Sequence, residues 1–144
     1  MIDQLLRLFQ GAKAPAIEEP HLAVAVLLVE AGLMAGDFSA EERTMTARLL
    51  SRRFALPPDE AEELIQRAET RARDTAQYFP FTHSLNTNMS IEAKIEVVEM
   101  LWRIAYADGN LDPFEDQLIR QVAGLLHVPD RDRMDAKRRV LDGL

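Results

Sequence analysis

The sequence predicts an all-α protein, a compact helical bundle of about seven to eight helices, and three observations favour this fold class. Apolar residues recur along most of the chain at the spacing of one helix face. Residues that begin and end helices separate these stretches, and no β-rich alternation of apolar and polar residues competes with them. One helical pattern also occurs twice, which predicts two three-helix repeats related by a pseudo-twofold axis.

The composition limits the classes of protein to consider. A chain of 144 residues fits one domain and can bury about two-thirds of its unfolded surface. The chain has no cysteine, which excludes disulfides, thiolate zinc sites and thiol nucleophiles. Its net charge of −7 argues against a general nucleic-acid binder, which needs a basic face.

The N-terminal part, residues 1–19, is expected to form a short amphipathic helix followed by a linker. Helical spacing places Ile2, Leu5, Leu6 and Phe9 on one face. That face can pack on the domain, bind a partner or touch a membrane weakly. No apolar run is long enough to span a bilayer, and the first residues lack a signal-peptide pattern. We therefore expect a cytoplasmic protein, in solution or at the inner face of the membrane.

Residues 20–144 form the predicted helical domain, and its first repeat covers roughly 21–76. Residues 21–35 are apolar nearly all round, as in a central buried helix, with Glu30 as the exception. Gly36 ends this helix, and a capping box from Ser39 to Glu42 opens the next. A break at residues 54–58 precedes a third helix over about residues 59–76.

An aromatic cluster at residues 78–81 and a short helix over 82–87 are expected to link the two repeats. The second repeat, roughly residues 90–142, begins at Ser90, whose long helix runs to residue 107. Further helices run to His127 and over residues 130–141. Core positions are expected for three aromatic residues, Trp102, Tyr106 and Phe114. The last helix is expected to make its apolar contacts through Met134, Val140 and Leu141.

The two repeats align at a constant offset. Gly36, Ser39 and Glu42 match residues 73 positions later, namely Gly109, Asp112 and Glu115. At the same offset Glu30 falls on Arg103. A carboxylate in an apolar helix needs a partner, so we predict an ion pair or close approach of these two side chains.

The corner between the first two helices of the second repeat is acidic. Residues 108–116 contain four carboxylates and no basic residue, and Asp108, Asn110 and Asp112 supply alternate oxygen side chains that suit a hard divalent cation. An EF-hand is excluded, because Pro113 replaces its glycine and Ile119 its glutamate. The alternative is a solvated, metal-free corner, in which these residues only cap the two helices.

The chain resembles the tellurite-resistance TerB family, particularly small bacterial TerB-like proteins. The resemblance covers roughly residues 20–142 and rests on residues 101–112 with Glu115, and on residues 25–31, 36–38 and 41–42. It implies an all-helical fold with two repeats, and a divalent-cation site for calcium, magnesium or zinc. Related domains occur in stress-response systems and in a membrane-anchored co-chaperone.

The resemblance implies particular metal ligands. Asp108 and Glu115 match the family signature in the second repeat and Glu42 matches it in the first, whereas Ala35 stands where the first repeat would carry its aspartate. A symmetric pair of sites is therefore not expected. Four further oxygen side chains are secondary candidates: Asp37, Glu30, Asp112 and Asn110.

Enzymatic activity and an organic cofactor are not expected. The three histidines show no metal-ligand spacing, and no glycine-rich phosphate loop or nucleophile elbow occurs. Two hypotheses stay open. One is a divalent-cation-binding domain, and the other is a metal-free interaction module whose acidic corner attracts an unknown protein partner.

Overall fold

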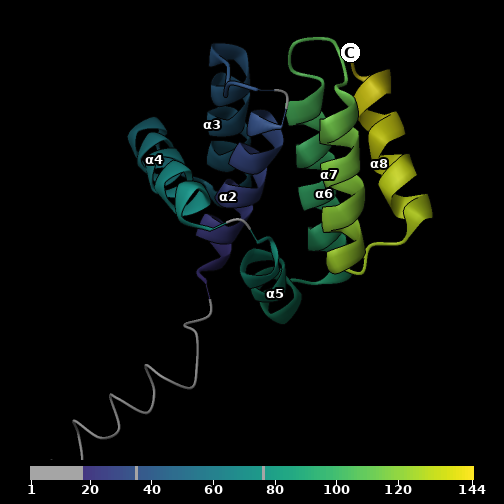
Figure 1. The fold of residues 1–144 in the computed structure, drawn as a ribbon, viewed down its shortest axis with the longest axis horizontal. Helices are drawn as coiled ribbons and strands as arrows, with labels where there is room; N and C mark the ends of the chain where they lie inside the picture. The colour runs from purple at the N-terminus through teal and green to yellow at the C-terminus, as the bar shows by residue number, and fades with distance from the viewer. Residues whose placement is uncertain (1–17, 35, 76) are drawn as a thin grey trace, which may run out of the picture.

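The computed structural model describes residues 18–34, 36–75 and 77–144. In these ranges the chain forms an all-α compact bundle without strands, which confirms the predicted fold class (Figure 1). The predicted helix over residues 1–10 lies outside the described residues. The described helices are α2 (Pro20–Leu33), α3 (Ala40–Phe54), α4 (Pro58–Asp74), α5 (Phe79–Asn88), α6 (Ile91–Ala105), α7 (Pro113–Leu125) and α8 (Asp130–Asp142).

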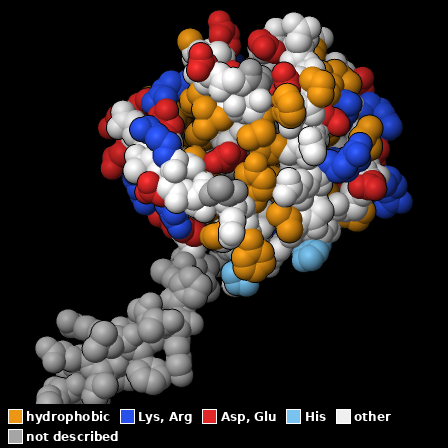
Figure 2. All heavy atoms as spheres, in the orientation of Figure 1, with side chains coloured by type: hydrophobic (Ala, Val, Ile, Leu, Met, Phe, Trp, Pro, Cys, Tyr) orange, Lys and Arg blue, Asp and Glu red, His pale blue; other side chains and the backbone are white. Residues whose placement is uncertain are grey.

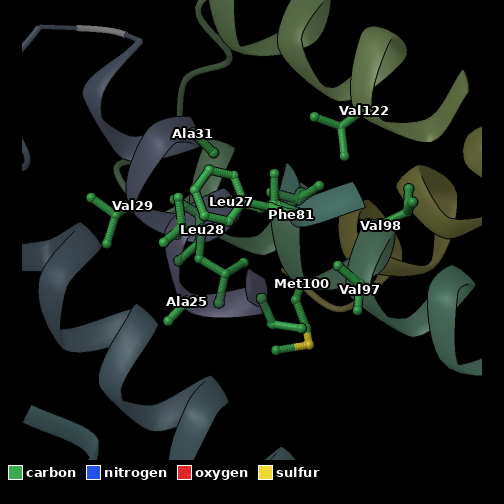
Figure 3. Packing of buried hydrophobic residues seen from close by; sticks show 14 of the residues in the cluster. Ala25, Leu27, Leu28, Val29, Ala31, Phe81, Val97, Val98, Met100 and Val122 are labelled. Atoms are coloured by element: carbon green, nitrogen blue, oxygen red, sulfur yellow. The ribbon is translucent and has the colours of Figure 1, made fainter. Parts of the chain in front are cut away.

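Helix α2 is the centre of the bundle. It contacts α3, α4, α5, α6 and α7, which explains why its sequence lacks a polar face. Every residue from Leu22 to Val29 is buried. Figure 3 shows Leu27 and Leu28 of this helix beside Phe81 of α5, with Val97 and Val98 of α6 nearby. Helix α2 is therefore the element against which the five contacting helices pack.

The two predicted capping boxes are both present. At α3 the Ser39 hydroxyl accepts from the Glu42 N–H at 3.1 Å, and the Glu42 carboxylate accepts from the Ser39 N–H at 3.1 Å. At α7 the Glu115 carboxylate accepts from the Asp112 N–H at 3.4 Å. Each box satisfies backbone donors that a helix N-terminus leaves without intrahelical partners.

The preceding turns also correspond. Gly36 has φ 122° and Gly109 has φ 89°, values that glycine adopts without steric cost. The turns that follow α3 and α7 contain Ala55 and His127, both with positive φ. These local features agree with the predicted repeat, while the pseudo-twofold relation in space stays a prediction.

Several predicted helix boundaries differ from the observed ones by one to three residues. Helix α5 begins at Phe79 instead of residue 82, because Pro80 lies in its first turn, where a missing N–H breaks no hydrogen bond. Helix α6 ends at Ala105 instead of residue 107, and α4 ends at Asp74 instead of residue 76.

The core predictions for the second repeat were partly wrong. Trp102 is buried, but Phe114 is 64% exposed and Met134 and Leu141 are each 42% exposed. Val140, the third apolar contact predicted for this helix, is buried as expected, and Ala136 is buried as well. One contact that fixes its rotation is the Trp102 Nε1–H, which donates to the Arg133 carbonyl at 3.1 Å.

The predicted pairing of Glu30 with Arg103 was also wrong. Arg103 donates to Glu99, four residues earlier on the same helix, at 3.3 Å. Glu30 lies in a groove beside Met34 and Tyr78 instead. Alignment of two positions in a repeat does not make them neighbours, because neighbours are set by how the repeats pack.

Candidate acidic site at the α2–α3 and α6–α7 corners

The two interhelical corners lie at one end of the bundle. The α2–α3 corner and the α6–α7 loop are both at the top of Figure 1. In Figure 2 acidic side chains gather along the upper edge of the same view. The fold thus brings together two acidic segments that are far apart in the sequence.

Glu42 is buried at the start of α3, with only 6% of its surface exposed. Its Oε1 accepts the capping hydrogen bond, and its Oε2 lies close to Gly32 of α2. A β-carbon built on Gly32 would be 3.1 Å from that oxygen and 2.6 Å from the Phe38 ring. The absence of a side chain at residue 32 therefore allows Phe38 and Glu42 to pack directly on α2.

Glu115 is buried at the start of α7, with 2% of its surface exposed. Burial raises the pKa of this carboxyl from 4.5 to about 7. The hydrogen bond from the Asp112 N–H lowers the pKa, whereas the negative charges of Glu42, Asp108 and Asp112 raise it further. Glu42 and Glu115, from the two capping boxes, are thus close enough for their charges to interact.

No arginine or lysine among the described residues forms an ion pair with these four carboxylates. Arg43, next to Glu42 in the chain, instead bonds to Glu62 and Glu69 of α4. These hydrogen bonds raise the pKa of Arg43, so its charge is committed to the α3–α4 contact. The acidic charge of the site is therefore left uncompensated by described basic side chains.

The remaining predicted ligands have different positions. Asp108 is exposed, and its carboxylate accepts from the Asn110 N–H at 3.1 Å. Asp112 caps α7 by accepting from the Phe114 N–H at 2.8 Å. Asp37 is exposed, and Glu30 lies in the separate groove beside α4.

Glu42, Glu115, Asp108 and Asp112 form the acidic site as we define it from here on. Within the three described ranges, no group of three histidine, aspartate or glutamate side chains has the geometry to hold a metal ion unaided. The chemistry of the donors is that of hard oxygen ligands, which suit Ca²⁺ or Mg²⁺. Two buried carboxylates that repel each other would be favourably neutralised by such an ion.

Gly32 packs beside the acidic site, and sequence reasoning missed its role. A glycine inside an apolar helix usually costs about 1 kcal/mol relative to alanine, which indicates a close contact. The sequence does contain this signal, but it does not say which side chains make the contact.

We predict that Gly32→Ala destabilises the protein by about 1–3 kcal/mol, because the new methyl group overlaps Phe38. Gly124→Ala is the matched control in α7, where an added β-carbon meets nothing within 4 Å. It should stabilise by up to about 1 kcal/mol through helix propensity. Urea denaturation of the two variants tests this, and equal signs would contradict the proposed contact.

The fold and site define a class of protein: an all-helical domain in which the charges of two buried capping-box glutamates interact beside a central helix. The chain belongs to the TerB family, since the model of the family described as tellurite resistance protein TerB matches residues 21–138. No curated protein and no solved structure matches the chain significantly. None of the described helices has the length and apolar character needed to cross a membrane.

Proposed function

We propose that this TerB-family domain is a non-enzymatic domain that binds a divalent cation at the acidic site. The observation that carries the proposal is that two buried carboxylates, Glu42 and Glu115, lie close enough for their charges to interact and have no described basic partner. Burying like charges together is costly unless something neutralises them. A bound cation would remove that cost and favour the folded state.

Glu42 and Glu115 would be the protein's main ligands to the ion. Asp108, Asp112 and Asn110 offer further oxygen atoms at the same corner, and water would complete the coordination. Magnesium is often held by one or two carboxylates together with water, and calcium accepts a larger set of oxygens. We favour these ions over zinc, which binds mainly through cysteine and histidine with closed protein coordination in structural sites.

The consequence of binding would be mechanical. The ion would connect the first turn of α3 with the first turn of α7, which flank the central helix α2. It would stiffen the end of the bundle where these corners lie. Such a domain fits a stress-response or envelope-associated assembly, in the cytoplasm or at the inner face of the membrane.

The proposal is tested by thermal unfolding of chelator-treated protein at pH 8 and constant ionic strength, with Mg²⁺, Ca²⁺ or Zn²⁺ added back. We expect a saturable stabilisation by Mg²⁺ or Ca²⁺, which at 100 times the dissociation constant amounts to about 2.7 kcal/mol. Glu42→Gln and Glu115→Gln should each remove most of it. Both variants keep an oxygen that can accept the capping hydrogen bond.

Two further variants sharpen this experiment. Asp108→Asn should weaken binding, because it removes a charge at the corner without altering the capping boxes. Glu41→Gln, an exposed change in the first turn of α3, is the control and should retain the full cation effect. Equal cation effects in Glu41→Gln, Glu42→Gln and Glu115→Gln would show that the ions act non-specifically, and the proposal would be wrong.

A second candidate function is a metal-free interaction module, which the exposure of Phe114 favours. This ring is 64% exposed at the start of α7, next to Asp112 and Glu115 in the capping box. An exposed aromatic ring with neighbouring carboxylates suits a basic protein partner. Capture of partners by chelator-treated protein should then weaken at high salt and with Phe114→Ala, and should be unaffected by divalent cations.

A further inference from the structure

A groove away from the acidic site runs along α2 and the end of α4. Its volume is about 610 Å³. Its walls include Leu33 at the end of α2, Met34 directly after it, Ala72 of α4, and Tyr78 in the α4–α5 link. Figure 2 shows a band of hydrophobic side chains on the face where this link lies. An open groove with both apolar and charged walls is suited to an amphipathic segment.

Glu30 is the charged residue that the central helix α2 contributes to this groove. It lies half-buried in α2, and burial raises its pKa. Burial also raises the pKa of Tyr78, and the charge of Glu30 raises it further, so the two side chains are close. Arg73 and Asp74 are the other charged residues of the walls, and no described ion pair involves Glu30. The best occupant is therefore apolar with a single positive charge.

We propose that residues 2–9 of the same chain dock in this groove as an amphipathic helix, with Arg7 directed to Glu30. The segment has the required chemistry, because Arg7 is its one basic residue and Ile2, Leu5, Leu6 and Phe9 share a face. Residues 1–17 contain Asp3, Arg7 and Lys13, whereas the groove contains Glu30, Asp74 and Arg73. The side chains of residues 1–17 thus carry a net charge of +1 and the charged residues of the groove a net charge of −1, while within residues 2–9 Asp3 balances Arg7.

The described chain begins at a contact with α4, which forms one wall of the groove. Glu18 forms an ion pair with Arg71, and its carbonyl accepts a hydrogen bond from the Ser84 hydroxyl. Arg71 directly precedes the groove residue Ala72 on α4, and its guanidinium also lies over the Phe81 ring at 5.4 Å. Residues 10–17 can span at most about 29 Å, which is ample for a return from this anchor. The short tether raises the effective concentration of residues 2–9 at the groove, which favours docking within the chain over docking between chains.

The test uses the full chain, in which the lack of cysteine allows a spin label to be placed at one engineered position. Thr75→Cys places the label on the wall of the groove, and Arg138→Cys places it on exposed α8 as a matched control. Amide signals of residues 2–9 are recorded with the label paramagnetic and then reduced. The proposal predicts a strong loss of intensity from the Thr75 label and little loss from the Arg138 label.

Substitutions then separate the two parts of the interaction. Leu5→Asp combined with Leu6→Asp should restore the intensities, because charged residues cannot enter the apolar groove. Arg7→Gln and Glu30→Gln should each restore them in part, and combining the two should add little to either. Independent, fully additive effects would contradict the pairing of Arg7 with Glu30.

A mixed sample identifies the source of any docked segment. Isotope-labelled protein without cysteine is combined with unlabelled protein that carries the Thr75 spin label. If the intensity loss occurs only when isotopes and spin label are on the same chain, the segment docks within its own chain. An equal loss in the mixture, where the two labels are on different chains, would identify a second copy and overturn the proposal. Equal intensities with the Thr75 and Arg138 labels would overturn it as well.

Discussion

In chelator-treated protein, the contribution of Glu115 to the free energy of unfolding is expected to fall by about 3 kcal/mol as the pH rises from about 4.5 to 8. Glu115 is 2% exposed, and its burial with neighbouring negative charges raises its pKa to about 7. In the unfolded chain the carboxyl titrates near 4.5. Between these two values the folded state binds more protons than the unfolded state.

The sign follows from this difference in bound protons. When the native state holds the extra proton, raising the pH removes stability, because ionisation favours the unfolded chain. The stabilisation is fully present below about pH 4.5 and is lost as the pH rises through about 7. This pH dependence has the opposite sign to that of a typical carboxylate. A typical carboxylate has a lowered pKa in the folded state and stabilises the protein as the pH rises from acid.

The measurement is urea denaturation at several pH values for wild type and Glu115→Gln. The glutamine keeps an acceptor for the Asp112 N–H but has no charge to bury. At pH 8 we expect the variant to be the more stable by about 3 kcal/mol, and the difference should vanish near pH 4. Glu41→Gln should keep the wild-type pH profile, and parallel profiles for wild type and Glu115→Gln would contradict the raised pKa.

Trp102→Ala is expected to lower the free energy of unfolding by about 3–5 kcal/mol. Trp102 is 1% exposed in α6, and its Nε1–H donates to the Arg133 carbonyl of α8 at 3.1 Å. The Lys137 ammonium also lies 5.1 Å from the ring centroid. The substitution removes a large buried ring together with the hydrogen bond that joins α6 to α8.

Two further variants show whether the effect comes from this contact. Trp102→Phe keeps most of the apolar area but removes the indole N–H that donates to the Arg133 carbonyl, and should cost about 0.5–1.5 kcal/mol. Phe114→Ala removes an exposed ring and should change stability by no more than about 0.5 kcal/mol. Hydrogen exchange should show reduced protection of α8 in both Trp102 variants, and unchanged protection would contradict the contact.

The fold class and most helix ends could be predicted because their causes are local. Gly36, Gly109, Ser39 and Asp112 act on the backbone within one turn, and the all-round apolar pattern of α2 predicts its burial without knowledge of its neighbours. The predicted pairing of Glu30 with Arg103 failed for the opposite reason. It required a distance between helices, which a repeat in the sequence does not contain.

Hydrophobic periodicity and capping chemistry predict the described helices, the buried central helix and the two acidic corners, because both depend on residues a few positions apart. Helix packing brings the charges of Glu42 and Glu115 within range of each other, gives Glu42 space against α2 at Gly32, and places Glu30 in a different groove, none of which follows from the sequence. The physical reason is that helix packing sets which side chains share a desolvated environment. Burial and charge repulsion, and hence the pKa of Glu115, arise only once the two corners lie side by side.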